Sequence, residues 1–242
     1  MAESAALPGL AIPGSSISDV PRHSAVVRVT HWVMTLSFVG LLVSGVAILL
    51  SHPRLYWGET GAVGAPSLID LPLPFVLANQ NGWGRHLHFL SAWVLVLNGL
   101  LYALSGFLTQ HFRKNLLPAK SDLTWRSFSQ VISRHVRLQR PDAEEARTYN
   151  VLQRITYLVV VFGLFPLVIW TGLAMSPAIT SVAPVLVTVF GGQQSARTIH
   201  FFVSCFLLLF LFVHIGMICL AGFGNRVRSM ITGHTALGKE EA

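Results

Sequence analysis

Four long apolar runs constrain the fold of this chain more than any other feature of its sequence. They cover residues 29–50, 89–108, 155–175 and 199–220. Each has about the 20 residues that a helix needs to cross a lipid bilayer. Such runs are expected to be helical, because a helix satisfies its own backbone polar groups where no water is present. The sequence therefore predicts an all-α integral membrane protein with a bundle of four spanning helices.

The composition agrees with a membrane protein. Hydrophobic residues make up 52% of the 242 residues and charged residues only 11%, whereas soluble domains carry about a quarter charged residues. We expect residues 22–228 to form the membrane domain, with residues 1–21 and 229–242 as terminal tails. The net charge of +7 indicates attraction to anionic lipid. No basic folded domain is visible, so nucleic-acid binding is not expected.

The basic residues predict how the chain is oriented. Nine lysines and arginines lie in residues 109–154, against two in residues 51–85 and one in residues 176–198. Because lysine and arginine concentrate in cytoplasmic loops, we expect this long loop and both termini to be cytoplasmic. Within the loop, apolar residues at helical spacing over residues 128–135 predict a short basic amphipathic helix on the membrane surface.

Two histidines, His200 and His214, lie fourteen residues apart in the fourth run. That spacing is close to four helical turns, so both side chains leave nearly the same face, roughly 21 Å apart. An ionisable side chain inside a membrane is costly and marks a candidate functional site. The spacing predicts one helix that gives one ligand to each of two stacked metal centres.

Histidines in the first two runs complete the proposed pairs. With the predicted topology, His31 matches His214 in depth on the cytoplasmic side, and His88 matches His200 on the outer side. Imidazole suits haem iron, zinc and copper. Two histidines per site, with no nearby carboxylate or thiolate, favour haem, whose porphyrin supplies four more donors. Such iron has no open position, so no catalytic residue is predicted. Periodicity alone does not choose between His88 and His86.

Other residues near the candidate ligands have more ordinary interpretations. Arg28, Arg85 and Arg197 are candidate partners of haem propionates, or interfacial residues whose charged heads extend to water. Pro166 should kink the third span, because proline removes a helix hydrogen bond. The remaining histidines lie in loops or at span ends, where we expect them to be solvated.

Ordered motifs in all four runs resemble one protein family. They are Arg28-x-Thr-His31-Trp32 with Ser44-Gly45, Gly84-Arg85-x-x-His88-Phe89, Thr171-Gly172-Leu173-x-Met175-Ser176-Pro177, and the pair His200 and His214. Together they resemble the bacterial cytochrome b561 superfamily, the b-type cytochromes that serve as membrane subunits of Ni-hydrogenase, formate dehydrogenase and thiosulfate reductase. The resemblance covers nearly all of residues 21–228.

The resemblance implies a four-helix bundle that holds two non-covalent b-type haems. His31 and His214 would be the axial iron ligands of the inner haem, and His88 and His200 those of the outer haem. The resemblance selects His88 over His86 as the iron ligand, because the ligand histidine of the family lies directly before a phenylalanine. Members lie in the bacterial inner membrane and pass electrons between a quinone and a catalytic subunit on the outer face. Residues 56–61 most resemble the thiosulfate-reductase-like branch, whose partners resemble molybdenum-cofactor oxidoreductases.

We therefore expect an electron-transfer subunit of a respiratory complex, working between a quinone pool and a periplasmic oxidoreductase subunit. One alternative is a self-contained transmembrane haem reductase or oxidase acting on superoxide or ferric iron. That function needs an exposed haem edge or a five-coordinate haem. A second alternative is a haem-free transporter, for which internal repeats and polar, broken helices would be typical. Neither feature stands out in the sequence beyond Pro166.

Overall fold

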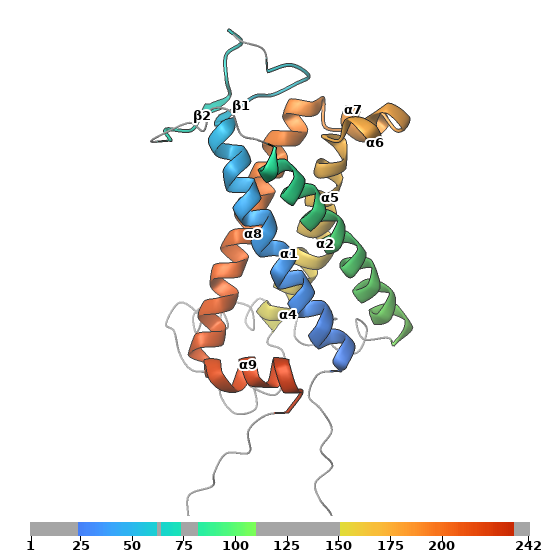
Figure 1. Cartoon of the computed structure of the whole chain (residues 1–242), viewed down its shortest axis with the longest axis vertical. Coiled ribbons are helices and arrows are strands. Elements are labelled where there is room, and N and C mark those ends of the chain that lie inside the picture. Colours follow the sequence, from blue (N-terminus) through green and yellow to red (C-terminus); the bar gives the residue numbers. More distant parts are fainter. Residues whose placement is uncertain (1–23, 62–63, 74–81, 110–150, 235–242) are drawn as a thin grey trace, which may run out of the picture.

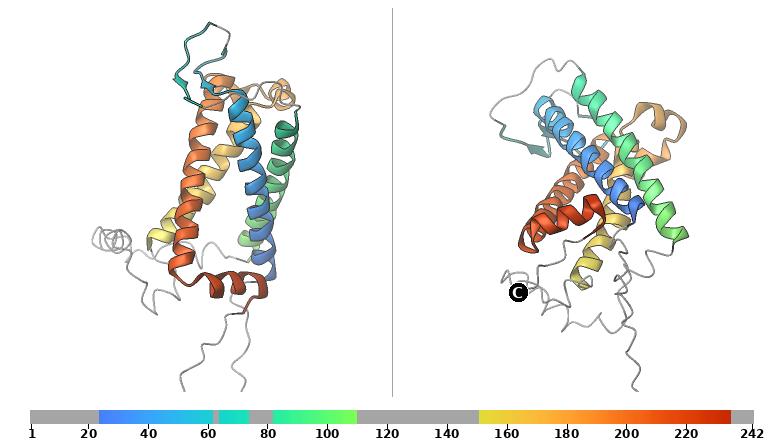
Figure 2. Two further views of the ribbon diagram at one scale, coloured as in Figure 1. Left: turned by 60° about the vertical axis from the view of Figure 1, so that its left-hand side comes forward. Right: turned by 60° about the horizontal axis from the view of Figure 1, so that its bottom comes forward.

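The computed structural model describes residues 24–61, 64–73, 82–109 and 151–234. Within these residues, four helices are long and apolar enough to cross a membrane: Ala25–Ser51, Trp83–Leu108, Ile155–Ala174 and Gln193–Leu220. They run side by side as an elongated bundle (Figures 1 and 2). The predicted all-α bundle with four spans is confirmed. The amphipathic helix predicted for residues 128–135 lies outside the described residues.

The first two spans pack along each other as one helix pair. Helix α1 (Ala25–Ser51) and helix α2 (Trp83–Leu108) make the most extensive contact between elements in the described part of the chain. Small side chains allow this approach, since a Cβ at Gly40 of α1 would collide with the side chain of Ser91 on α2. The large apolar side chains of this pair, such as Leu36, point outward, as expected of surfaces that face lipid tails.

The third and fourth spans form the second pair. The third span consists of α4 (Val151–Val159), the π-helical turn η3 (Val160–Leu164) and α5 (Phe165–Ala174), and it packs on α8 (Gln193–Leu220). Pro166 lies in the first turn of α5, directly after the π-helical turn. A π-turn is a common way for a helix to absorb a local break in its hydrogen bonding. The kink expected at Pro166 stays a prediction, and the structure shows a change of helix type directly before this residue.

One end of the bundle carries a small hairpin, and we call it the hairpin end. Strand β1 (Arg54–Leu55) pairs antiparallel with β2 (Ile69–Asp70). Two short helices, α6 (Pro177–Val182) and α7 (Val185–Thr188), lie at the same end (Figure 1). Across the hairpin, Arg54 Nε lies 3.1 Å from Asp70 Oδ2. The charge of Asp70 raises the pKa of the Arg54 guanidinium above its usual value.

Helix α9 (Phe223–Thr232) crosses the opposite end, which we call the α9 end (Figures 1 and 2). Gly222, with φ +92°, makes the turn from α8 into α9, and a left-handed conformation of this kind favours glycine. Two side chains of α1 hold the far end of α9. Arg28 Nη1 donates to the carbonyl of Ile231 at 2.7 Å, and Trp32 Nε1 donates to that of Met230 at 3.2 Å. The start of α1 and the end of α8 are thereby linked through α9.

Candidate metal centres

His88 and His200 face each other near the hairpin end of the bundle. Their ring centres lie 6.2 Å apart, with an angle of 60° between the ring planes. His88 lies near the start of α2 and His200 near the start of α8. The contact therefore joins the two helix pairs across the interior of the bundle. The structure thus brings together the two histidines that were matched in depth from the sequence, while their role as iron ligands stays a prediction.

His86 behaves differently from His88, although only two residues separate them. Its side chain is exposed and lies beside Gly82, where a Cβ would be 3.6 Å from the imidazole. Because His86 lies on the outside of the bundle start, it does not take part in the contact between His88 and His200.

A hydroxyl group from the neighbouring helix holds each ring of this pair. Ser44 Oγ on α1 lies 3.0 Å from His88 Nδ1, and Thr171 Oγ1 on α5 lies 2.9 Å from His200 Nδ1. Both hydroxyls come from the first helix of a pair and both histidines from the second. Since Nδ1 is engaged in each ring, Nε2 is the nitrogen that can bind a metal ion.

A glycine follows each of these hydroxyl residues. A Cβ built on Gly45 would lie 3.8 Å from His88 Cε1, and one on Gly172 would lie 3.6 Å from His200 Cε1. The edge of each imidazole therefore lies beside a residue without a side chain. Any larger residue at Gly45 or Gly172 would partly fill the space beside the rings, so the glycines leave room there for a flat group.

The arrangement fits a haem iron. A first-row metal ion bonded to one nitrogen of each ring, at about 2 Å per bond, would hold two imidazole centres roughly 6 Å apart, close to the separation found. Among the described residues, no group of three or more His, Cys, Asp and Glu is placed to hold a metal ion. The protein thus offers two imidazoles facing each other, which is the donor set that a porphyrin completes to six-coordinate iron.

His31 and His214 lie at the α9 end, on α1 and α8. His31 follows the start of α1 and His214 precedes the end of α8, so they share a depth. Their described ring contacts are with aromatic neighbours. His31 meets Trp32 edge-on at 5.4 Å, and His214 stacks on Phe210 at 5.8 Å with 24° between the planes. The structure thus gives this pair a common level, while a ring-to-ring contact is described for His88 and His200.

The residues on both sides of His31 are tied to other helices. Asn98 Nδ2 of α2 donates to the carbonyl oxygen of Thr30 at 2.8 Å. On the other side, Trp32 donates to α9 as described above. Because a hydrogen bond between helices resists sliding and rotation, above all when it is buried as that of Asn98 is, these two contacts help to fix the position at which α1 presents His31.

The family-like stretch Tyr56–Gly61 caps the helix that carries His200. The carbonyl oxygen of Gly58 accepts from the backbone N–H groups of Gln194 and Ser195, and the N–H of Gly58 donates to Ser195 Oγ at 2.8 Å. These are orphan donors, since the first N–H groups of a helix have no partner within it. Gly192, with φ +124°, packs against the Gly58 backbone so closely that a Cβ would collide. The loop thus fixes the start of α8 about two turns before His200.

The structure also places the three predicted arginines. Arg28 donates to α9, as above, and Arg197 donates to the backbone carbonyl of His52. Arg85 is exposed at the start of α2. Both of the first two arginines therefore hold helix ends together, at opposite ends of the bundle.

Ser44, Thr171 and Asn98 were not predicted as parts of the site. A signal for the first two is present in the sequence. Each is a hydroxyl residue followed by glycine inside an apolar run, a pattern that occurs in three of the four runs, the third time as Ser105-Gly106. Asn98 offers the simpler signal of a buried amide within a span.

A bundle of spanning helices that aims paired imidazoles at one another inside the membrane defines a membrane-bound electron carrier of the cytochrome type. The comparison with known families agrees, since residues 22–233 match prokaryotic cytochrome b561. The chain belongs to this family. Membership implies b-type haem and transfer of electrons within a membrane.

A curated relative is the putative protein-methionine-sulfoxide reductase subunit YedZ1 of Azospira oryzae (strain ATCC BAA-33 / DSM 13638 / PS). It is 27% identical to this chain over 224 residues, which is 88% of this chain and 96% of the relative. The similarity therefore extends over nearly the whole of both proteins. No solved structure shows a significant match.

Proposed function

We propose that this chain is the di-haem membrane subunit of a respiratory complex, carrying electrons between a quinone and the catalytic subunit of a periplasmic oxidoreductase. The observation that carries the proposal is the approach of His88 and His200 to 6.2 Å. In this proposal these two histidines bind the iron of one haem, and His31 and His214 bind that of a second.

The two centres divide the path across the membrane. Haem iron supplies reversible one-electron transfer. The protein supplies imidazole ligands, an apolar surrounding that keeps water out, and a fixed spacing between the two levels. Helix α8 contributes one ligand to each level, and fourteen residues separate His200 from His214, or roughly 21 Å along a helix. That spacing accounts for most of a hydrocarbon core about 30 Å thick.

We place the hairpin end at the periplasm and the α9 end at the cytoplasm of a bacterial inner membrane. The end of α2 and the start of α4 lie at the α9 end (Figure 1), and residues 109–154, which connect these helices in the sequence, include nine basic residues. In a background without Cys205 and Cys219, single cysteines at Ser67 and Ser129 should label from opposite sides. Labelling of both from the periplasm would contradict this orientation.

The orientation assigns a role to each end. The His88–His200 centre would exchange electrons with the periplasmic partner, and the His31–His214 centre would exchange them with quinone. The name of the Azospira oryzae relative makes a protein-methionine-sulfoxide reductase one candidate for the kind of partner. A molybdenum cofactor in that partner is proposed from the family resemblance.

The comparison of His88→Ala with His86→Ala tests the ligand assignment. His86 is a matched control because it is exposed and lies two residues away on the same helix. We expect His86→Ala to keep two haems per chain and His88→Ala to lose or weaken the one at the hairpin end. Haem per chain and reduced-minus-oxidised spectra measure this. Equal haem content in both variants would contradict the proposal.

A further inference from the structure

Ser44 and Thr171 occupy equivalent positions in the two helix pairs. Each lies on the first helix of its pair, precedes a glycine, and contacts Nδ1 of the histidine on the second helix, at 3.0 Å for His88 and 2.9 Å for His200. The same contact thus arises twice, from different helices and different hydroxyl residues. This repetition indicates a function for the hydroxyls beyond helix packing.

The hydroxyl protons are already used within their own helices. Ser44 Oγ donates to the carbonyl oxygen of Gly40 at 2.6 Å, and Thr171 Oγ1 donates to that of Leu167 at 2.8 Å. A hydroxyl has one proton to donate and two lone pairs that accept. With the proton directed to the backbone, the hydroxyl oxygen accepts from the imidazole. Nδ1 of each histidine therefore carries the hydrogen.

Each hydroxyl proton also has a second backbone acceptor on its own helix. The carbonyl oxygens of Leu41 and Val168, one turn before Ser44 and Thr171, lie 3.2 Å and 3.0 Å from the two hydroxyl oxygens. With the proton directed to the backbone of its own helix, each hydroxyl oxygen keeps its lone pairs to accept from the imidazole.

We propose that Ser44 and Thr171 are positioning residues that hold His88 and His200 in the Nδ1–H tautomer, leaving both Nε2 lone pairs for one shared iron. This inference rests on the proposed haem ligation. A histidine that donates its second N–H to an acceptor has a fixed ring orientation and a more basic ligating nitrogen. A more basic ligand stabilises ferric iron more than ferrous iron. The two hydroxyls therefore lower the reduction potential of the hairpin-end haem and tighten its binding.

The test removes each hydroxyl in the full-length, haem-loaded protein. Ser44→Ala and Thr171→Val delete the acceptor with little change of volume. We expect each to raise the potential of the hairpin-end haem, to weaken its retention by about 10–100-fold, and to leave the other haem unchanged. The double variant should shift the potential further than either single one. Redox titration followed by absorption, haem per chain, and the low-spin ferric signal in electron paramagnetic resonance give three readouts.

Ser37→Ala is the matched control. Ser37 is a buried residue of α1 whose hydroxyl makes the same kind of bond to a carbonyl four residues earlier, that of Val33 at 2.8 Å. No contact of the Ser37 hydroxyl with a histidine is described. It should leave both potentials at their wild-type values. Ser44→Thr and Thr171→Ser keep a hydroxyl and should restore the wild-type potential and ferric signal. If Ser44→Ala does not fold, Ser44→Cys replaces it, since a thiol is only a weak acceptor.

The outcomes separate this inference from the proposal on which it rests. If the Ser44 and Thr171 variants match Ser37→Ala in potential and ferric signal, the positioning role is wrong while the haem ligation stands. If they shift both haems equally, their effect is a general loosening and the positioning role is also wrong. If His88→Ala and His200→Ala keep full haem, the ligand assignment itself fails, and the inference fails with it.

Discussion

The histidines at the two ends of the bundle differ in the contacts that the structure describes for them. At the hairpin end, hydroxyl groups contact Nδ1 of His88 and His200, so the direction of each free lone pair is set by a hydrogen bond. At the α9 end, His214 stacks on Phe210 and His31 meets Trp32. An aromatic contact sets the plane of a ring but does not choose between its nitrogens. The rings of His88 and His200 are therefore oriented by hydrogen bonds with the helices packed beside them.

The segments that close the two ends also differ. At the hairpin end, the backbone of Gly58 caps the start of α8 through close glycine-to-glycine contact. At the α9 end, a whole helix folds across the bundle and two long side chains, Arg28 and Trp32, hold its last turn. The first closure combines close backbone packing with hydrogen bonds of the side chains of Ser195 and Arg197 on α8, whereas the second depends on side-chain donors of α1. Substitutions should consequently affect one end at a time.

The largest expected effect separates the two levels of α8. His200→Ala should remove or weaken the hairpin-end haem and leave the α9-end haem reducible by quinol. His214→Ala should do the reverse, because a site that loses one imidazole keeps only five donors while the distant site keeps six. Haem per chain and reduced-minus-oxidised spectra of both variants measure this. If either change removes both haems from protein that remains folded in the membrane, the two ends are not independent.

A second prediction concerns the glycine closure at the hairpin end. Gly192→Ala places a Cβ against the Gly58 backbone at φ +124°, and strain at such a φ alone costs about 1–3 kcal/mol. We expect a lower apparent Tm and weaker retention of the hairpin-end haem. Gly224→Ala in α9 is the control, since a Cβ there meets nothing within 4 Å. Equal thermal stability of the two variants would show that the closure is not tight.

A third prediction addresses the α9 end. Trp32→Phe keeps an aromatic ring beside His31 but removes the donor to the carbonyl of Met230, a loss of about 0.5–1.5 kcal/mol. Faster hydrogen exchange in α9 and a shifted potential of the α9-end haem are expected, with the hairpin-end haem unchanged. Hydrogen exchange measured by mass spectrometry tests this prediction. Unchanged protection of α9 from exchange would contradict the view that Trp32 holds α9 against α1.

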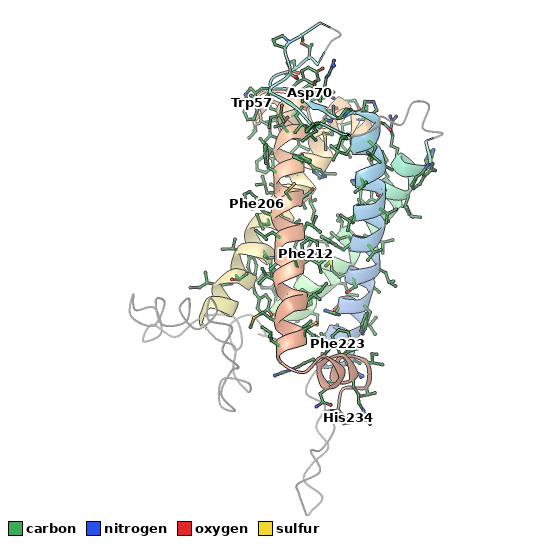
Figure 3. All side chains as sticks on the ribbon, turned by 90° about the vertical axis from the view of Figure 1, so that its left-hand side faces the viewer. Trp57, Asp70, Phe206, Phe212, Phe223 and His234 are labelled. Carbon is green, nitrogen blue, oxygen red and sulfur yellow. The ribbon has the colours of Figure 1, made fainter. Side chains whose placement is uncertain are left out.

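The smallest effect is expected for the exposed pair Arg54 and Asp70 on the hairpin; Figure 3 labels Asp70 at this end of the bundle. Asp70 raises the pKa of Arg54. The contribution of this ion pair to folding stability is therefore complete below the ordinary pKa of arginine, and it is lost only as the pH rises above the raised pKa. It is therefore constant through the neutral range. Arg54→Ala should leave haem content and both potentials unchanged at neutral pH. A change in either would mean that the hairpin is coupled to the haem level.

The sequence predicted the spans because length and apolar content decide membrane crossing. It placed the start of the second span at residue 89, whereas α2 begins at Trp83. Arg85 and His86 break the apolar run, but hydrogen bonding in a helix continues through polar residues. In the same way α8 begins at Gln193, before its apolar part. Hydropathy thus predicts which residues lie in the lipid, whereas backbone hydrogen bonding decides the residues at which α2 and α8 begin.

Other features depended on contacts that a linear pattern does not contain. Helix α9 was not predicted, although Gly222 and Gly233 bracket it with positive φ. The two-residue strands are too short to give a periodic signal. Depth matching along the spans predicted that His88 and His200 would meet, but the hydroxyls that hold them come from other helices. Outward-facing residues of α8 such as Phe206 and Phe212 (Figure 3) are indistinguishable from core residues by composition alone.

The central claim is that α8 links two separate bis-histidine haems at the two ends of one bundle. The most direct test is a redox titration of the purified wild-type protein, with haem quantified per chain and the ferric spin state recorded. Two low-spin b-type haems per chain, titrating as two components, are the result that the account predicts. A single haem per chain, or a high-spin five-coordinate signal, would contradict it.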